Sequence, residues 1–131
     1  MVEAASLAGL PLAKAVCHLW GWCGFAEDEQ KGFELLKKIA EETGDAMSEN
    51  VVGYCFHNGH GVAQNLTKAV EWYTKSAEKG HCWAMYNLGY CFENGYGVAL
   101  NLATALEWHT KARDAGCERA EERINIIREN L

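Results

Sequence analysis

Residues 53–80 read GYCFHNGHGVAQNLTKAVEWYTKSAEKG, and residues 89–116 read GYCFENGYGVALNLATALEWHTKARDAG. Each matched residue lies 36 positions after its counterpart, as Trp108 does after Trp72. A fixed period of about 20–50 residues is typical of stacked repeat proteins. The sequence therefore predicts a linear array of similar units, and any function must be one that such an array can perform.

The composition is that of one ordinary folded domain. The chain has 131 residues, 49% of them apolar, and its mean hydropathy is -0.23. This length and apolar fraction are enough to form one continuous core. Its net charge of -6 disfavours nucleic acids and anionic membranes as partners, because both require clustered Lys and Arg. No apolar run approaches the roughly 18 residues that span a bilayer. We expect no nucleic acid or membrane partner.

The cysteines predict a reducing compartment. Six cysteines would permit three disulfides in a secreted chain. Cys55 and Cys91, however, occupy the same repeat position, and equivalent helices about 8–10 Å apart exceed the ~4.4–6.8 Å Cα separation of a disulfide. The N-terminus also lacks the basic and apolar regions of a signal peptide. We therefore expect buried thiols in a cytoplasmic protein.

Each clear repeat is predicted to be a pair of helices. The predicted ranges are 49–58 and 85–94 for the first helix, helix A, and 66–79 and 102–115 for the second, helix B. In helix B, Leu102, Ala105 and Leu106 follow the i, i+3, i+4 spacing of a buried helical face. The face continues to Trp108, so Trp72 and Trp108 are predicted core residues.

Glycines and small polar residues predict where these helices end and pack. Gly53 and Gly89 lie within helix A, where glycine costs about 1 kcal/mol relative to alanine, so we expect helix B to approach closely there. Asn65, Asn101 and the earlier Asp28 are expected N-caps of helix B. The turn between the helices contains glycines that we expect to have positive φ: Gly59, Gly61, Gly95 and Gly97.

The two ends of the array differ from its centre. Gly44 lies 36 residues before Gly80, so a degenerate first copy is predicted, with its helix B over 29–42. At the other end, one apolar face of a helix without a helix B partner predicts a cap, formed by Ala120, Ile124, Ile127 and Leu131. The predicted organisation is one domain, 1–131, with a degenerate repeat at about 12–47, clear repeats at 48–83 and 84–119, and a capping helix at 120–131.

The motif closely resembles the SEL-1-like repeat, a relative of the tetratricopeptide repeat with a period of about 36 residues. In the second clear copy the matching residues are Ala84, Leu88, Gly89, Phe92, Gly95, Gly97, Val98, Asn101, Thr104, Ala105, Trp108, Lys111, Ala112 and Gly116. The resemblance is close over 48–120 and looser over 13–44. Asn65 and Asn101 stand where the family usually has Asp, and Phe56 and Phe92 where it usually has Tyr.

The resemblance implies an all-α fold, an α/α superhelical solenoid of helix pairs with a C-terminal capping helix. It also implies a non-catalytic adaptor or scaffold that binds other proteins. A secreted, cysteine-rich branch of the family links helices A and B by disulfides. Cys55 and Cys91 fall elsewhere in the repeat, so we place this chain outside that branch.

By analogy with the tetratricopeptide pattern, the helices A should line a concave face that binds a protein or peptide. The expected partner-binding residues are Asn50, Tyr54, His57, Asn58, Trp83, Tyr86, Tyr90, Glu93 and Asn94. Aromatic rings supply contact area, while amides and a carboxylate pair with peptide groups. The alternative is that Tyr54 and Tyr90 only pack between successive helices A.

Other functions have weaker support in the sequence. Histidines and cysteines lie close together in three places, namely Cys55 with His57 and His60, His81 with Cys82, and Cys17 and His18 with Cys23. None has paired zinc-ligand spacing, and no nucleophile or phosphate-binding motif is present. We therefore expect no cofactor and no enzyme, with a ligand, metal or redox-sensing module as the alternative. A monomer is expected, and weak self-association through the apolar first end stays open (Leu7, Leu10, Leu12 and Leu19).

Overall fold

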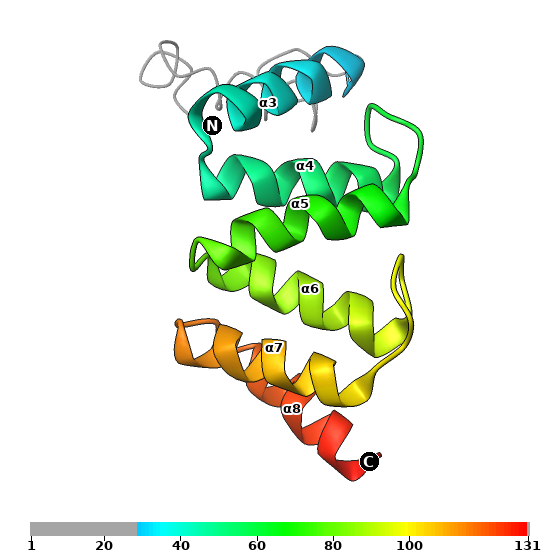
Figure 1. The fold of residues 1–131 in the computed structure, drawn as a ribbon, viewed down its shortest axis with the longest axis vertical. Helices are drawn as coiled ribbons and strands as arrows, with labels where there is room; N and C mark the ends of the chain where they lie inside the picture. The colour runs from blue at the N-terminus through cyan, green and yellow to red at the C-terminus, as the bar shows by residue number, and fades with distance from the viewer. Residues whose placement is uncertain (1–28, 131) are drawn as a thin grey trace, which may run out of the picture.

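The structure, a computed structural model, describes residues 29–130, which form α-helices and no strand. The helices are α3 (Glu29–Thr43), α4 (Ala46–Asn58), α5 (Leu66–Glu78), α6 (Cys82–Asn94), α7 (Leu102–Asp114) and α8 (Ala120–Glu129). They are stacked in chain order along the long axis of the molecule (Figure 1). The prediction of an all-α array of helix pairs is confirmed. Several expected features lie outside the described residues: the Asp28 cap, the Cys17–His18–Cys23 group, the apolar leucines and Leu131.

Each helix A begins three residues earlier than the sequence predicted. The first helix, α4, starts at Ala46 because Asp45 is its N-cap, and its carboxylate accepts the backbone N–H of Ser48 at 2.9 Å. At the same repeat position before α6, His81 makes no side-chain cap bond, yet α6 starts in the same register at Cys82. The position of the helix start therefore depends on the repeat and not on the cap alone.

The predicted caps of helix B are confirmed. Asn65 Oδ1 accepts the backbone N–H of Lys68, and Asn101 Oδ1 accepts that of Thr104, each at 3.0 Å. Both asparagines have extended backbone angles, which orient the side chain over the first turn. Helices α5 and α7 consequently begin at the predicted residues.

Helix B packs closely against the mid-helix glycines of helix A, as predicted. A Cβ atom at Gly53 would lie 2.8 Å from Cδ1 of Tyr73, and one at Gly89 would lie 2.9 Å from Cε1 of His109. Real Cβ atoms do not approach other atoms this closely, so the side-chain ring occupies the space that glycine leaves. The repeat thus joins its two helices by one glycine–ring contact, Gly53–Tyr73 in the first clear copy and Gly89–His109 in the second.

The turn glycines join neighbouring repeats. All four expected residues have positive φ, between 72° and 75°. A Cβ atom at Gly61 would overlap the carbonyl oxygen of Glu29, and one at Gly97 would overlap that of Leu66. Each turn therefore rests on the first turn of the helix B before it, and a larger residue at Gly61 or Gly97 would separate the two repeats.

The core is continuous from α3 to α6. It includes buried Leu36, Val52 and Leu88, and the predicted core residue Trp72 is only 8% exposed. Trp108 packs against the same core but is partly exposed. Lysine ammonium groups cover both indole rings, 4.3 Å from the centroid of Trp72 and 4.6 Å from that of Trp108.

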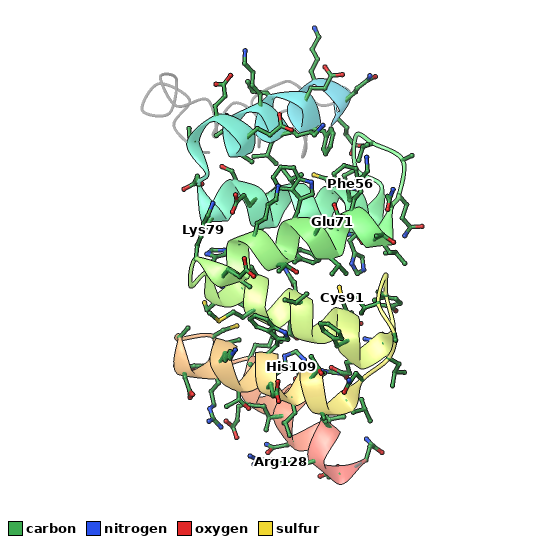
Figure 2. The ribbon with its side chains drawn as sticks, viewed as in Figure 1. Phe56, Glu71, Lys79, Cys91, His109 and Arg128 are labelled. Carbon is green, nitrogen blue, oxygen red and sulfur yellow. The ribbon has the colours of Figure 1, made fainter. Side chains whose placement is uncertain are left out.

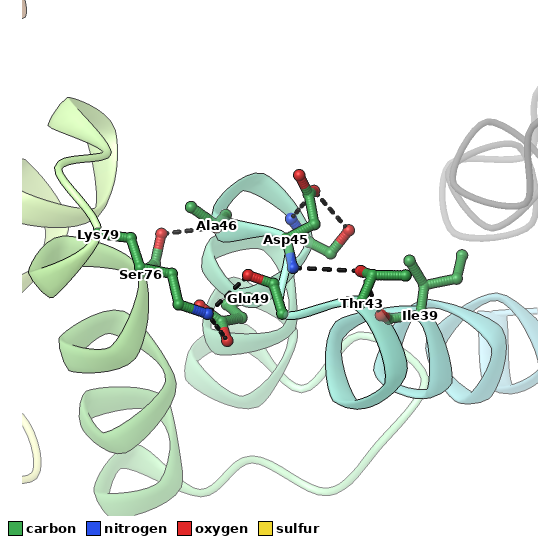
Figure 3. Close-up of polar contacts among 9 residues, drawn as sticks. Ile39, Thr43, Asp45, Ala46, Glu49, Ser76 and Lys79 are labelled. Carbon is green, nitrogen blue, oxygen red and sulfur yellow. Dashed lines mark hydrogen bonds and ion pairs between the residues drawn. The ribbon is translucent and has the colours of Figure 1, made fainter.

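Side chains at the end of α5 form hydrogen bonds with the turn between α3 and α4 (Figure 3). Ser76 Oγ donates a hydrogen bond to the carbonyl oxygen of Ala46 at 2.6 Å. Lys79 Nζ donates to the carbonyl oxygen of Gly44 at 2.6 Å and to Glu49 Oε2 at 2.7 Å. These bonds fix where the first helix A starts relative to the helix B that follows it.

The last helix, α8, packs against α7 through the predicted apolar face. Ala120, Ile124 and Ile127 are buried, as a capping helix requires. Asn125 is exposed at the repeat position of Gly53 and Gly89, so α8 lacks the glycine that receives a ring from helix B.

Replacing Gly89 by alanine tests the glycine–ring contact. The new methyl group would meet the His109 ring at 2.9 Å, so we expect Gly89→Ala to lower the free energy of unfolding by about 1–3 kcal/mol. The matched control is Asn125→Ala on α8, which should change it by less than about 0.5 kcal/mol. Urea unfolding followed by circular dichroism measures both, and a Gly89→Ala protein as stable as wild type would refute the contact's role.

Candidate functional site

A groove runs along the helices A, from α4 across α6 to α8. We call it the tyrosine groove, and it encloses about 490 Å³. Its lining residues are Tyr54, His57, Asn58, Tyr73, Tyr86, Asn87, Tyr90, Tyr96 and Arg123. Most of them come from helices A, while Tyr73 reaches it from α5 and Tyr96 from the turn after α6. The repeat thus places aromatic rings from successive units on one surface.

The rings in the groove pack against one another. The ring of Tyr96 lies nearly perpendicular to that of His57, with centroids 5.2 Å apart, and 5.9 Å from that of Tyr90. At the α4 end, Tyr54 stacks on His60 at 5.8 Å and is 41% exposed. Aromatic pairs at these distances hold each other in place, so the groove offers a preformed apolar surface.

The groove includes part of the residue set expected from the sequence. Tyr54, His57, Asn58, Tyr86 and Tyr90 line it. The other expected residues, Asn50, Trp83, Glu93 and Asn94, are not among its lining residues. Asn50 accepts a hydrogen bond from Asn87 at 3.0 Å, and Trp83 is 44% exposed with its ring 5.7 Å from that of Tyr86.

The asparagines at the ends of the helices A have a structural role. The Nδ2 group of Asn58 donates to the carbonyl oxygen of Tyr54, and that of Asn94 donates to Tyr90, at 3.0 and 2.9 Å. Asn130, one more period along, makes the same bond within its own helix. These amides satisfy carbonyl groups at the helix end. They leave mainly the side-chain oxygen for contact with a ligand.

The sequence did not identify four groove residues: Tyr73, Asn87, Tyr96 and Arg123. Two of them have counterparts one period earlier that were not predicted groove residues either. Tyr96 lies 36 residues after His60, and Arg123 lies 36 residues after Asn87. Extending the repeat into the capping helix relates Arg123 to Asn87, but only the structure shows that this repeat position lines the groove.

Beneath the groove, Glu93 joins a buried histidine to Arg123. The Glu93 side chain is 9% exposed, and its Oε1 atom lies 3.2 Å from Nε2 of His109. Arg123 donates to both carboxylate oxygens, from Nε and from Nη2. His109 is fully buried in the interface between α6 and α7; Figure 2 labels it. The carboxylate that the sequence assigned to the peptide is therefore already occupied within the protein.

Burial lowers the pKa of His109 to about 4. The neighbouring Glu93 would ordinarily raise this pKa, but its charge is matched by Arg123, so the loss of hydration dominates. His109 is therefore neutral at pH 7. Burial also lowers the pKa of His57.

The thiols and histidines form no reactive or metal-binding group in the part of the chain described. Cys55 and Cys91 are buried, and burial raises the pKa of each thiol to about 12, which opposes thiolate formation. Cys82 and Cys117 are also free cysteines that form no disulfide. Between residues 29 and 130, no three His, Cys, Asp or Glu side chains are arranged to hold a metal ion. Over the same residues, no helix has both the length and the apolar character needed to cross a bilayer.

The buried histidine predicts a loss of stability in mild acid. Unfolded, His109 binds a proton near pH 6.5, whereas in the folded chain it does so near pH 4. The contribution of His109 to the free energy of unfolding is therefore complete above pH 6.5. It is lost as the pH falls toward 4, and the free energy of unfolding then decreases by at most about 1.4 kcal/mol per pH unit.

The variant His109→Tyr isolates this effect, because it reproduces the Gly53–Tyr73 contact with a ring that does not titrate in this range. Urea unfolding at several pH values between 6.5 and 5 should show a smaller decrease for the variant than for wild type. Parallel curves would mean that His109 does not carry the pH dependence.

Known proteins share this repeat. The family model for the Sel1 repeat matches residues 3–43, 46–81 and 84–117. The chain is also similar to the sel1-like repeat-containing proteins L18 and L21 of Acanthamoeba polyphaga mimivirus. It is 36% identical to L18 over 44 residues and 42% identical to L21 over 59 residues. These matches cover 34% and 45% of the chain but only 8% and 11% of the relatives, so the matched segments span about a tenth of those proteins.

Solved structures have the same fold. A Sel1 repeat protein from Oxalobacter formigenes matches 96% of the chain and 51% of its own length, with a TM-score of 0.79 and 27% identity. The protective antigen c5321 of uropathogenic Escherichia coli matches 92% of the chain and 26% of its own length, with a TM-score of 0.79 and 31% identity. Cysteine-rich protein B of Helicobacter pylori, at 24% identity and a TM-score of 0.70, covers 90% of the chain and 92% of its own length and supports the fold alone.

Proposed function

The chain belongs to the Sel1 repeat family, whose members are generally non-enzymatic scaffolds for protein–protein interaction, and from this membership we propose that it is an adaptor that binds a peptide segment of another protein in the tyrosine groove. The observation that carries the proposal is the groove itself, in which aromatic rings from the successive helices A α4 and α6, from α5 and from the turn after α6 lie on one surface. Tyrosine is favoured at such surfaces because it supplies large contact area and a polar group with little loss of side-chain entropy.

The shape of the groove favours a peptide over a small molecule. It is open and follows the array from α4 to α8, so a bound chain can lie across several repeats. Its rings offer apolar contacts, and the phenol groups and Asn87 can pair with peptide N–H and C=O groups. The functional assignment therefore rests on Tyr54, Tyr86 and Tyr90 together with Tyr73 and Tyr96.

Charge and cysteine chemistry refine the proposal. The net charge of -6 favours a protein partner over a nucleic acid or anionic membrane. The unpaired, buried thiols suit the reducing environment of the cytoplasm. The raised pKa of Cys55 and Cys91 weighs against a redox-sensing module. We propose that the protein acts as a non-catalytic monomer without a cofactor.

Selection from a peptide library tests the groove although the natural partner is unidentified. A phage-displayed library of random linear peptides is selected on the immobilised protein, and the enriched peptides are then measured against variants. We expect Tyr54→Ala/Tyr90→Ala to weaken their binding by about tenfold or more, because aromatic anchors each contribute on the order of 1 kcal/mol or more. Fluorescence anisotropy of labelled peptides gives the Kd values.

The matched control is Glu71→Ala/Glu107→Ala, two exposed positions 36 residues apart on helices B. Figure 2 labels Glu71 on α5. This control should bind as wild type does. Equal losses in both double variants, or selected peptides that bind the tyrosine variant unchanged, would show that the groove is not the binding site.

A further inference from the structure

The tyrosine groove differs in charge from the chain as a whole. Among its lining residues in the described part of the chain, Arg123 is the one with a formal charge at neutral pH, because no Asp or Glu lines the groove. His57 adds no charge, since burial lowers its pKa. The full chain, by contrast, has a net charge of -6. Arg123 is therefore the lining residue whose charge can complement an anionic group of the partner, in competition with Glu93 beneath it.

Arg123 retains donors for such a group. Its Nε and Nη2 atoms donate to Glu93, whereas a guanidinium has five N–H groups, so those on Nη1 stay outside this pair. The side chain is 24% exposed and lies over the ring of Tyr90, with Cζ 5.7 Å from the ring centroid. Arg123 is thus held in position by Glu93 and Tyr90 while it faces the groove.

The surrounding polar groups also suit an anion. Tyr54, Tyr86, Tyr90 and Tyr96 line the groove with partly or largely exposed side chains, whose hydroxyl groups can donate to a ligand. Burial raises the pKa of Tyr86, which keeps its phenol protonated at neutral pH. The remaining N–H groups of Arg123 and these phenols are donors that suit a carboxylate ligand, whereas a basic side chain would face Arg123, and the nearest acid, Glu93, is already paired with it.

We propose that the bound peptide places an aspartate or glutamate side chain on Arg123, and that Glu93 competes with it for the guanidinium. The inference rests on the function proposed above. Arg123 lies on α8, at the opposite end of the groove from Tyr54 on α4. A side chain is favoured over a chain terminus because the proposed ligand is a segment within another protein, which presents side-chain carboxylates. Glu93 would then set the affinity by holding part of the guanidinium.

The composition of the selected peptides is the first test. Peptides displayed through their C-termini present only side-chain carboxylates, so a pool selected on wild type should be enriched in Asp and Glu over the starting library. Selection on Arg123→Gln should lose this enrichment, while selection on Arg128→Gln should keep it. Arg128 is the matched control, since it is an exposed arginine on the same helix and does not line the groove.

Variants of Arg123 and Glu93 should change the affinity for an acidic peptide in opposite directions. For an acidic synthetic peptide from the wild-type pool, Arg123→Gln should raise the Kd about tenfold or more and Glu93→Gln should lower it severalfold. The same peptide with its Asp or Glu changed to the amide should bind weakly and respond little to either change. Added salt should weaken the binding of the acidic peptide more than the binding of its amide counterpart. Melting curves establish that each variant is folded, and the Glu93→Gln result stands even if Arg123→Gln unfolds.

Two results would overturn the inference while leaving the groove intact. One is a pool of neutral or basic peptides that still requires Tyr54 and Tyr90. The other is an acidic peptide whose affinity does not change in Glu93→Gln, or whose binding depends only on a free C-terminal carboxylate. If no selected peptide depends on Tyr54 and Tyr90, the proposed function itself fails, and the inference falls with it.

Discussion

The contact between a glycine in helix A and a ring on helix B determines the geometry of this protein. At Gly53 and at Gly89 a methyl group would lie within 3 Å of the Tyr73 or His109 ring, so the two helices can approach only with glycine at this position. This distance sets how deeply each helix B packs, and hence how the next helix A is presented. Because both clear repeats use the same contact, the helices A keep one spacing and their exposed rings line up along the array. The groove is a consequence of that spacing.

The identity of the ring decides what lies beneath the groove. In the first clear copy the ring is Tyr73, which itself lines the groove. In the second copy the equivalent residue is His109, which is fully buried and pairs with Glu93. That pairing brings a carboxylate below the surface and orients Arg123 above it. The equivalents of Glu93 and Arg123 one period earlier are His57 and Asn87, so three differences between the copies together form this polar network and give the two ends of the groove different chemistry.

The sequence was sufficient for the fold, because the period, the N-cap asparagines and the glycines are local signals repeated in register. It was insufficient for the start of helix A, since Asp45 acts as a cap only where the preceding turn places it. It also assigned Glu93 to the peptide, whereas burial and Arg123 engage that carboxylate internally. Arg123 was missed because it comes from the capping helix, and Tyr96 because it comes from a turn. Contacts between distant segments decide such roles, and no single repeat contains them.

The exposed Asn125 has a consequence for anyone who wishes to lengthen this scaffold. Asn125 lies at the repeat position where α4 and α6 have a glycine that contacts an aromatic ring. A helix B added after α8 could therefore not pack on α8 as α5 packs on α4. A seamless extension would need glycine there and a ring on the incoming helix. A second copy of a helix like α5 or α7 would likewise find no glycine on α8 to receive its ring.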